Sequence, residues 1–285
     1  MEAIPLRVTG ITKAFGGGKD LRTLIPWLGK HIKREDRTTV VHSVSFDVER
    51  GEIYGIIGAN GSGKSTLIRM LSTLLLPDKG ECSVFGFDVV KDSNKVRCLI
   101  NRVSADPSFF RNMSALENLL FFGRVYGLTP REVKQKTPPI FGRLGLEWDK
   151  ATEPMSHLSR GQQQKVAVAR SFLTSPVLML LDEPTTGLDP RSKRDVQAFI
   201  RQVQAEHDAT ILLTTHDMDE AEVLCNRIAF LAGGRIVAEG TPLDLRRQVA
   251  GRRPLESINM ETVFMEMTGR SIEEDEEPQE VAVGS

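Results

Sequence analysis

Residues 58–66 combine three glycines, a lysine and two hydroxyl side chains at a spacing suited to binding phosphate groups. They are Gly58, Ala59, Asn60, Gly61, Ser62, Gly63, Lys64, Ser65 and Thr66. The glycines let the backbone turn tightly, so that successive N–H groups face one concavity, at the positive end of a following helix. In the pattern G-x-x-x-x-G-K-[ST], the lysine reaches the β- and γ-phosphates of a nucleotide and the serine hydroxyl is a ligand for Mg²⁺. We therefore expect a nucleotide site in which Lys64 is catalytic and Ser65 binds the metal, with a chance glycine-rich turn as the alternative.

A second chemical pattern is a pair of acidic residues, Asp182 and Glu183, directly after the apolar run Val177–Leu181. Because side chains alternate along a strand, the two carboxylates point in different directions. Asp182 is placed to bind Mg²⁺, and Glu183 to polarise the water molecule that attacks the γ-phosphate. An exposed acidic turn is the alternative, but such a turn would not need five apolar residues before it. The pair therefore predicts nucleotide hydrolysis with Glu183 as the general base.

Strands and helices alternate around these two patterns. Strands are predicted at Val44–Val48, Ile53–Ile57, Val177–Leu181 and Ile211–Leu213, and helices at Lys64–Leu75, after Pro190 and at Asp217–Leu224. Such alternation predicts an α/β fold with a mainly parallel sheet and helices on both faces. Ligands of such a sheet bind beyond the carboxyl ends of its strands, which is where both chemical patterns begin.

Composition and charge exclude several other classes of protein. The chain has 285 residues, and its 37 Lys and Arg balance 38 Asp and Glu, giving a formal net charge of −1. This balance argues against a nucleic-acid partner, whose phosphates require a basic surface. We expect no secretory signal, and no apolar run approaches the roughly 18 residues that span a bilayer. Cys82, Cys98 and Cys225 form no pair motif and are expected to be reduced thiols.

Three further motifs resemble those of a known family. Leu158–Gln162 resemble the signature motif of ABC-type ATPases, and they lie between the phosphate loop and the acidic pair, in the order that this family uses. Thr186–Asp189 resemble the family's D-loop, and Thr215–Asp217 resemble its switch histidine. The phosphate loop and the acidic pair are similar to its Walker A and Walker B motifs. Five motifs in this order carry the resemblance further than any one of them alone.

The resemblance implies a P-loop NTPase fold, with a RecA-like core, an antiparallel β edge and the ABC helical subdomain. It also implies a head-to-tail pair of ATPase subunits with two ATP molecules between them. Each ATP would contact the phosphate loop of one subunit and the signature motif of the other. The nucleotide-contacting residues outside the phosphate loop would be Phe15, Ser159, Arg160, Gly161, Gln162 and Asp189. His216 would contact the γ-phosphate during catalysis and Phe15 would stack on adenine, although a core role is the alternative for Phe15.

Two positions depart from the family's pattern. Arg160 stands where the signature motif usually has its second glycine, which adds a cation near the other subunit's ATP. Ala105 aligns with a glutamine that in the family contacts Mg²⁺ and senses the membrane partner. The sequence leaves open what replaces this glutamine, and Asp106 is a weak candidate.

Residues 16–37 are longer than an ABC ATPase needs at this point. Apolar side chains at helical spacing share one face: Leu21, Leu24, Leu28 and Ile32. With Trp27 and basic residues beside them, they predict an amphipathic helix over residues 21–34 that contacts a permease and the membrane surface. A surface helix packed on its own domain is the alternative. Similar insertions occur in ATPase subunits that export polysaccharides.

The expected organisation is an ABC ATPase domain over residues 1–250, with its helical subdomain at about 106–170. A C-terminal helix is expected over residues 251–270, followed by an acidic, disordered tail over 271–285. Within the former, Glu261–Arg270 resemble the last helix of drug- and lipid-exporter ATPases of the ABC-2 type.

Together these features predict the ATP-hydrolysing subunit of an ABC-2-type exporter, which uses ATP and Mg²⁺ and lies peripherally on the cytoplasmic side of the cell membrane. Its expected partners are a second ABC ATPase subunit, identical or a close paralogue, and integral-membrane permease subunits. The alternatives are an importer ATPase, a soluble ABC ATPase of DNA repair and a translation factor. A repair ATPase would need a longer insertion between Lys64 and Ser159, and a translation factor normally carries two cassettes. The substrate and the direction of transport are left open.

Overall fold

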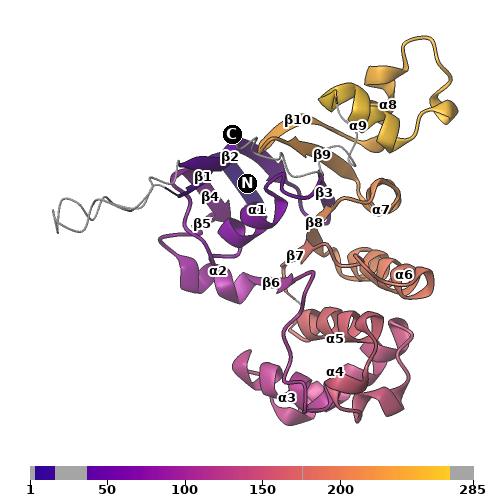
Figure 1. Ribbon diagram of the computed structural model, residues 1–285. Coiled ribbons are helices and arrows are strands. Elements are labelled where there is room, and N and C mark those ends of the chain that lie inside the picture. Colours follow the sequence, from indigo (N-terminus) through magenta and orange to yellow (C-terminus); the bar gives the residue numbers. More distant parts are fainter. Residues whose placement is uncertain (1–3, 17–36, 175, 270–285) are drawn as a thin grey trace, which may run out of the picture.

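The computed structural model describes residues 4–16, 37–174 and 176–269. The amphipathic helix expected at 21–34 and the acidic tail at 271–285 lie outside these residues. The described chain forms two β-sheets with helices between and around them (Figure 1).

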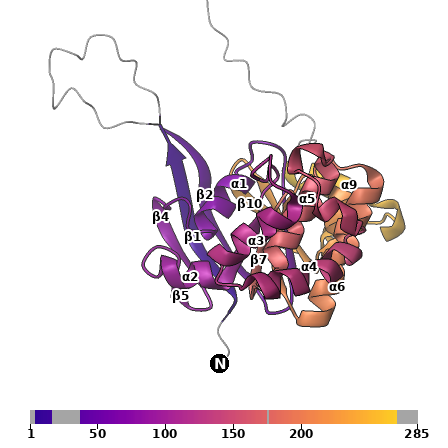
Figure 2. The same cartoon turned by 90° about the horizontal axis from the view of Figure 1, so that it is seen from below.

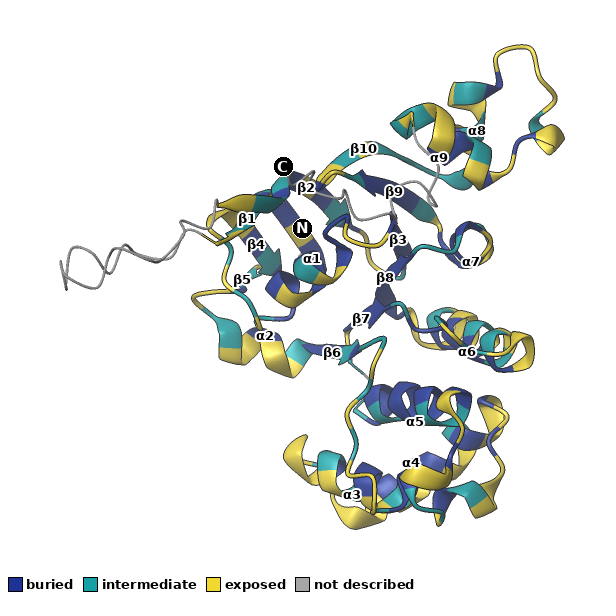
Figure 3. Cartoon of the chain, viewed as in Figure 1, coloured by how far each residue is buried: buried dark blue, intermediate teal, exposed yellow. Residues whose placement is uncertain are grey.

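A six-stranded sheet carries both chemical patterns. Its strands are β3 (Ile53–Ile57), β6 (Ile100–Val103), β7 (Leu178–Asp182), β8 (Thr210–Thr215), β9 (Arg227–Ala232) and β10 (Arg235–Gly240). They lie in the order β10-β9-β3-β8-β7-β6, and all neighbours are parallel except β10, which pairs antiparallel with β9. Strands β3, β7 and β8 are buried along their whole length, as expected for apolar strands of a parallel sheet covered on both faces (Figure 3).

A smaller antiparallel sheet lies beside the first one and forms the antiparallel edge that the resemblance implies. Its strands are β1 (Leu6–Phe15), β2 (Thr38–Val48), β4 (Lys79–Val84) and β5 (Phe87–Asp88), in the order β2-β1-β4-β5. Helix α1 (Lys64–Leu71) lies between the two sheets (Figure 1). Its apolar side chains, such as Leu67 and Leu71, share one core with both sheets and hold α1 behind the phosphate loop.

The remaining helices and 3₁₀ turns complete the fold. They are α2 (Ser93–Leu99), α3 (Ala115–Val125), α4 (Pro130–Arg143), η2 (Trp148–Ala151), η3 (Met155–His157), α5 (Arg160–Phe172), α6 (Pro190–His207), α7 (Met218–Leu224), α8 (Pro242–Ala250), η4 (Leu255–Ser257) and α9 (Met260–Thr268). Helices α5 and α6 pack on the face of the parallel sheet opposite α1. Helices α3 and α4 and most of α5 fall in the range expected for the helical subdomain. Figure 2 shows α4 and α6 on the side away from the antiparallel sheet.

Two helices differ in extent from the predictions. Helix α1 ends at Leu71, four residues before the predicted end, because Thr73 adopts a left-handed φ of 62°. The N–H groups of Leu74 and Leu75 then turn back to the carbonyl of Arg69 and close the helix, in the manner of a C-terminal cap.

The C-terminal helix predicted over residues 251–270 is shorter in the structure, where α9 spans Met260–Thr268. The Phe264 ring packs edge-on against Phe230 of β9, with 5.3 Å between ring centroids, so α9 shares the core of the parallel sheet. The division of the chain at residue 250 stays a prediction. Among the residues described, no helix has the length and apolar character needed to cross a membrane.

Candidate active site

The loop between β3 and α1 is a tight turn that depends on glycine. A Cβ at Gly58 would lie 2.3 Å from a carbonyl oxygen of β9, and one at Gly63, whose φ is 106°, would lie 2.9 Å from a carbonyl oxygen of β2. Inside the turn, the buried Lys64 ammonium donates to the carbonyls of Gly58 at 2.7 Å and Ala59 at 3.0 Å. The loop is therefore wrapped around its own lysine.

The other loop residues are distributed between the interior and the surface. Ala59 and Ser62 are buried, whereas Asn60 and Gly61 are exposed and Thr66 is half-buried. Helix α1 begins at Lys64 and directs its free N–H groups at this loop, an arrangement that favours an anion. The nine residues of the predicted phosphate site thus form the loop before α1 and the first turn of that helix.

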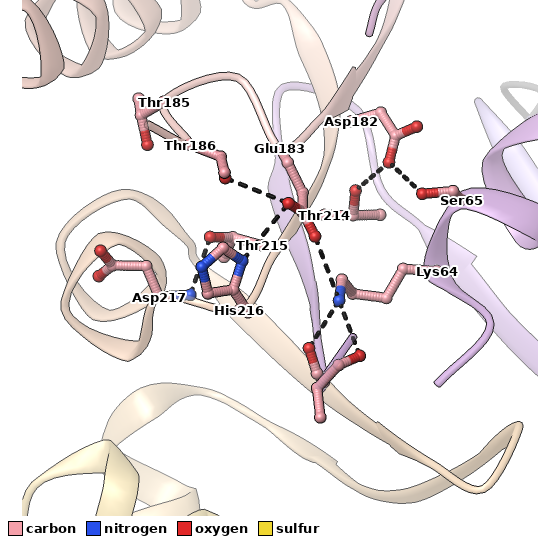
Figure 4. Close-up of polar contacts among 12 residues, drawn as sticks. Lys64, Ser65, Asp182, Glu183, Thr185, Thr186, Thr214, Thr215, His216 and Asp217 are labelled. Carbon is pink, nitrogen blue, oxygen red and sulfur yellow. Dashed lines mark hydrogen bonds and ion pairs between the residues drawn. The ribbon is translucent and has the colours of Figure 1, made fainter. Parts of the chain in front are cut away.

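Asp182, at the end of β7, lies beside the start of α1 (Figure 4). Its Oδ1 accepts hydrogen bonds from the hydroxyls of Ser65 at 3.2 Å and Thr214 at 2.9 Å. Carboxylate and hydroxyl oxygens are the hard ligands that Mg²⁺ prefers. The two predicted metal-binding residues are therefore together, and their chemistry fits Mg²⁺. Thr214 was not predicted, because its contact with Asp182 depends on the pairing of β7 with β8, which joins residues that are distant in sequence.

The Glu183 carboxylate contacts three other side chains of the site (Figure 4). One carboxylate oxygen lies 3.2 Å from the Lys64 ammonium, and the other lies 3.4 Å from Nδ1 of His216 and accepts from the Thr186 hydroxyl at 3.1 Å. The backbone of Glu183 is strained, with a φ of 50°. The three residues predicted to be catalytic, Lys64, Glu183 and His216, are thus in mutual contact through this carboxylate.

These contacts hold the Glu183 carboxylate in its charged form. The pKa of Glu183 falls to about 2, mainly because of the His216 contact; burial opposes this shift, and the Lys64 charge supports it. A carboxylate with a lowered pKa stabilises the fold above its unfolded pKa and loses that contribution as the pH falls through the folded pKa.

We therefore expect acid to destabilise the wild type more than Glu183→Gln. Between pH 7 and pH 2, the wild type should lose about 2–3 kcal/mol more free energy of unfolding than the variant. Urea titrations at several pH values measure this difference. Glu81→Gln, which neutralises an exposed carboxylate, should follow the wild type. Parallel losses in the wild type and Glu183→Gln would show that the Glu183 contacts contribute no stability.

Residues that were not predicted connect the loop that carries His216 to the segment after Glu183. Asp217 caps α7 and forms an ion pair with Lys193 of α6. Glu220, buried in α7, accepts a hydrogen bond from Thr185 at 2.6 Å. These contacts join three segments that are distant in sequence, so no local pattern could have indicated them.

The signature motif begins helix α5. The Ser159 side chain accepts from the N–H of Gln162, and the Gln162 side chain accepts from the N–H of Ser159 at 2.9 Å, which forms a capping box. A Cβ on Gly161 would lie 2.8 Å from the Ser192 hydroxyl, so the motif packs closely against the start of α6. Asp189 caps α6 by accepting from two backbone N–H groups at 3.0 Å. Ser159, Gly161, Gln162 and Asp189 thus form a second group of predicted residues.

The two positions that depart from the family pattern are connected by a contact between Arg160 and Asp106. Its guanidinium carbon lies 3.1 Å from where a Cβ on Gly187 would be, and its Nη2 lies 3.6 Å from the carboxylate of Asp106. The Asp106 side chain is 95% exposed. Asp106 therefore faces Arg160 at the surface, and the structure gives no contact between it and Asp182 or Ser65 in the part of the chain it describes. The candidate replacement for the missing glutamine at Ala105 is thus directed elsewhere.

The two groups of predicted residues lie in different parts of the molecule, since α1 and α5 are well separated in Figure 1. Phe15 lies at the end of β1; the residue is 42% exposed, and the Lys13 ammonium lies 5.7 Å from its ring centroid. The exposed ring disfavours the core role that was its alternative.

Comparison with known proteins decides the family. A family model described as ABC transporter matches residues 41–186. The chain is 38% identical over 201 residues to the ABC transporter ATP-binding protein NatA of Bacillus subtilis, a match covering 70% of this chain and 81% of NatA. This chain belongs to the ABC transporter family. Its ABC ATPase domain binds ATP, and membership implies that it hydrolyses ATP.

Further similarities place this ABC ATPase among proteins of similar fold. It is 41% identical over 213 residues to the Nod factor export ATP-binding protein I of Neorhizobium galegae, a match that covers 75% of this chain and 61% of that protein. A solved structure of an ATP-binding subunit of an ABC transporter matches it with a TM-score of 0.74 at 29% identity, covering 92% of this ABC ATPase and 98% of that chain. The predicted P-loop NTPase fold with an ABC helical subdomain is confirmed.

Proposed function

We propose that this ABC ATPase hydrolyses ATP to ADP and phosphate and so powers export of a substrate through separate permease subunits. The observation that carries the proposal is the contact of Glu183 with both Lys64 and His216 at the carboxyl ends of β7 and β8. Export is supported by the Nod factor relative, whose name describes it as an export protein. This similarity favours export over the importer, DNA-repair and translation alternatives.

The residues of the site have distinct roles in this proposal. The loop N–H groups and Lys64 bind the phosphates, Ser65 and Asp182 hold Mg²⁺, and the exposed Phe15 ring stacks on adenine. Bound Mg²⁺ supplies positive charge that stabilises the phosphate oxygens in the transition state. Glu183 accepts the proton of the attacking water, and His216 fixes the position of Glu183 and of the γ-phosphate.

The Lys64–Glu183 contact links phosphate binding to the strength of the base. A carboxylate with a pKa of about 2 is a weak base. When the ammonium of Lys64 turns to the phosphates, Glu183 loses one of the positive charges that lower its pKa, so its pKa rises. Phosphate binding therefore makes Glu183 a better proton acceptor.

The second group of residues serves the ATP of another subunit. The free N–H groups at the start of α5, with Ser159 as the cap, form an anion-binding helix N-terminus distant from Lys64 of the same chain. We infer that Ser159, Arg160, Gly161, Gln162 and Asp189 contact the nucleotide held by a second ABC ATPase subunit, identical or a close paralogue.

An exposed aromatic surface is suited to the permease. Phe110 and Phe121 are each 46% exposed and pack edge-on at 4.9 Å between ring centroids. Behind them, the Arg170 guanidinium stacks on Phe109 and Phe122, at 4.9 Å and 4.5 Å from the ring centroids. Clustered exposed aromatic rings mark protein contacts. We infer that integral-membrane permease subunits of the ABC-2 type bind here and hold the chain at the cytoplasmic side of the membrane, with residues 21–34 as a predicted second contact.

Export is tested in cells that lack this chain. We expect such cells to retain at least one compound that wild-type cells release, and the wild-type chain, but not Glu183→Gln, to restore its release. Mass spectrometry of cell extracts and medium measures the distribution. Failure to take up a compound from the medium, without retention of any, would instead favour the importer alternative.

A further inference from the structure

Strand β6 carries an arginine next to the strand of Asp182. Arg102 pairs in parallel register with Leu180 of β7, two residues before Asp182. Its neighbour Asn101 faces α5, where its amide donates to the carbonyl of Ser171. Because side chains alternate along a strand, Arg102 faces the opposite side of the sheet, the side of α1. Asp182 contacts Ser65 of α1 on that same side.

The arginine extends along its strand to the level of Asp182. Its Nη2 donates to the hydroxyl of Ser104, two residues further on, at 2.5 Å. Val103 is the register partner of Leu181, and Ser104 and Asp182 are the next residues after this pair. The Nε of Arg102 is buried and has no hydrogen-bond partner among the described residues.

The Arg102 guanidinium is influenced by one negative charge, on Asp182, and one positive charge, on Arg69. Burial is the main influence on its pKa and lowers it; the Asp182 charge raises the pKa, and the Arg69 charge on α1 lowers it. A half-buried cation is stabilised by a nearby anion, and Asp182 is the anion that acts on Arg102 here. The same carboxylate is the proposed ligand of Mg²⁺.

We propose that Arg102 is a positioning residue that sets how strongly the metal and the nucleotide depend on each other. The positive charge of its guanidinium partly neutralises the Asp182 carboxylate. Arg102 lies three residues before Ala105, which stands in place of the family's glutamine. This inference rests on the proposed ATPase function. In the absence of metal, Arg102 attracts the phosphates of ATP; in its presence, Arg102 repels the divalent cation. Arg102 therefore weakens the coupling between metal binding and nucleotide binding.

The test measures the affinity for a fluorescent, slowly hydrolysed ATP analogue with Mg²⁺ and with EDTA. We expect the ratio of the two dissociation constants, EDTA over Mg²⁺, to rise about three- to tenfold in Arg102→Met. Loss of the guanidinium charge weakens ATP binding in EDTA and removes a repulsion of the metal in Mg²⁺. Arg102→Lys, which retains the charge, should stay near the wild-type ratio. Arg7→Met, which removes an exposed arginine paired with Asp47, should also leave it unchanged.

A purely structural role would change both dissociation constants by the same factor and leave their ratio constant, which would overturn the inference. A lower ratio in Arg102→Met would also overturn it. Arg102→Gln is measured in parallel, and melting temperatures show whether each variant folds, so at least one neutral variant reports the ratio. Absence of binding by the folded wild type in either condition would overturn the proposed function and the inference together, whereas wild-type binding with a constant ratio would overturn the inference alone.

Discussion

Glu183→Gln is expected to lower the rate of ATP hydrolysis by about a hundredfold or more, the usual contribution of a general base. ATP affinity should stay near the wild-type value, because the amide keeps the size of the side chain and the phosphate loop is unchanged. The amide cannot accept the proton of the attacking water, so ATP remains bound and the pair of subunits stays closed. Phosphate release and nucleotide-binding titrations measure the two effects separately.

The matched control for this variant is Thr186→Val. It removes the hydroxyl that donates to Glu183 at 3.1 Å but leaves the carboxylate in place. We expect a reduction in rate much smaller than that of Glu183→Gln. An undiminished rate in Glu183→Gln would show that another group is the base.

Lys64→Ala is expected to abolish ATP turnover and to weaken ATP binding about 10- to 100-fold, the loss of one or two charged hydrogen bonds to phosphate. The substitution removes the ammonium that the loop carbonyls and Glu183 surround. Equilibrium binding of a fluorescent ATP analogue and a phosphate-release assay test the two parts of this expectation.

Lys95→Ala is the control for the loss of a lysine charge, since Lys95 pairs with Asp92 at the surface. Its ATP affinity and turnover should equal those of the wild type. Wild-type turnover in a folded Lys64→Ala variant would exclude Lys64 from phosphate binding and would remove the basis of the proposed site.

The parts of the site that could be predicted are those whose chemistry is local in sequence. The phosphate loop and the Ser159–Gln162 capping box each lie within a few residues, so spacing alone indicated the loop and the S-x-x-Q pattern could have indicated the box. Apolar runs also predicted β3, β7 and β8, because buried parallel strands have almost no polar positions. The capping box nevertheless went unpredicted, and Gln162 was assigned only to the nucleotide.

The parts that could not be predicted depend on segments brought together by the fold. The contact of Arg160 with Asp106 joins residues 54 positions apart, and Asp182 meets Thr214 across two strands. The end of α1 was also missed, since the apolar residues after Leu71 continue the helical pattern, whereas a single left-handed residue, Thr73, stops the helix. A left-handed backbone conformation at one residue cannot be predicted from the spacing of apolar residues.

The proposed mechanism requires that ATP held by Lys64 of one subunit is hydrolysed with the signature motif of another. Mixing two inactive variants tests it: Lys64→Ala, and Ser159→Asp, which retains the helix cap but places a negative charge where the second subunit's phosphate would bind. In a mixed pair of chains, one site has both an intact Lys64 and an intact Ser159. We expect phosphate release to reappear on mixing, although each folded variant is inactive alone. Activity on mixing no greater than the sum of the two separate variants would contradict it.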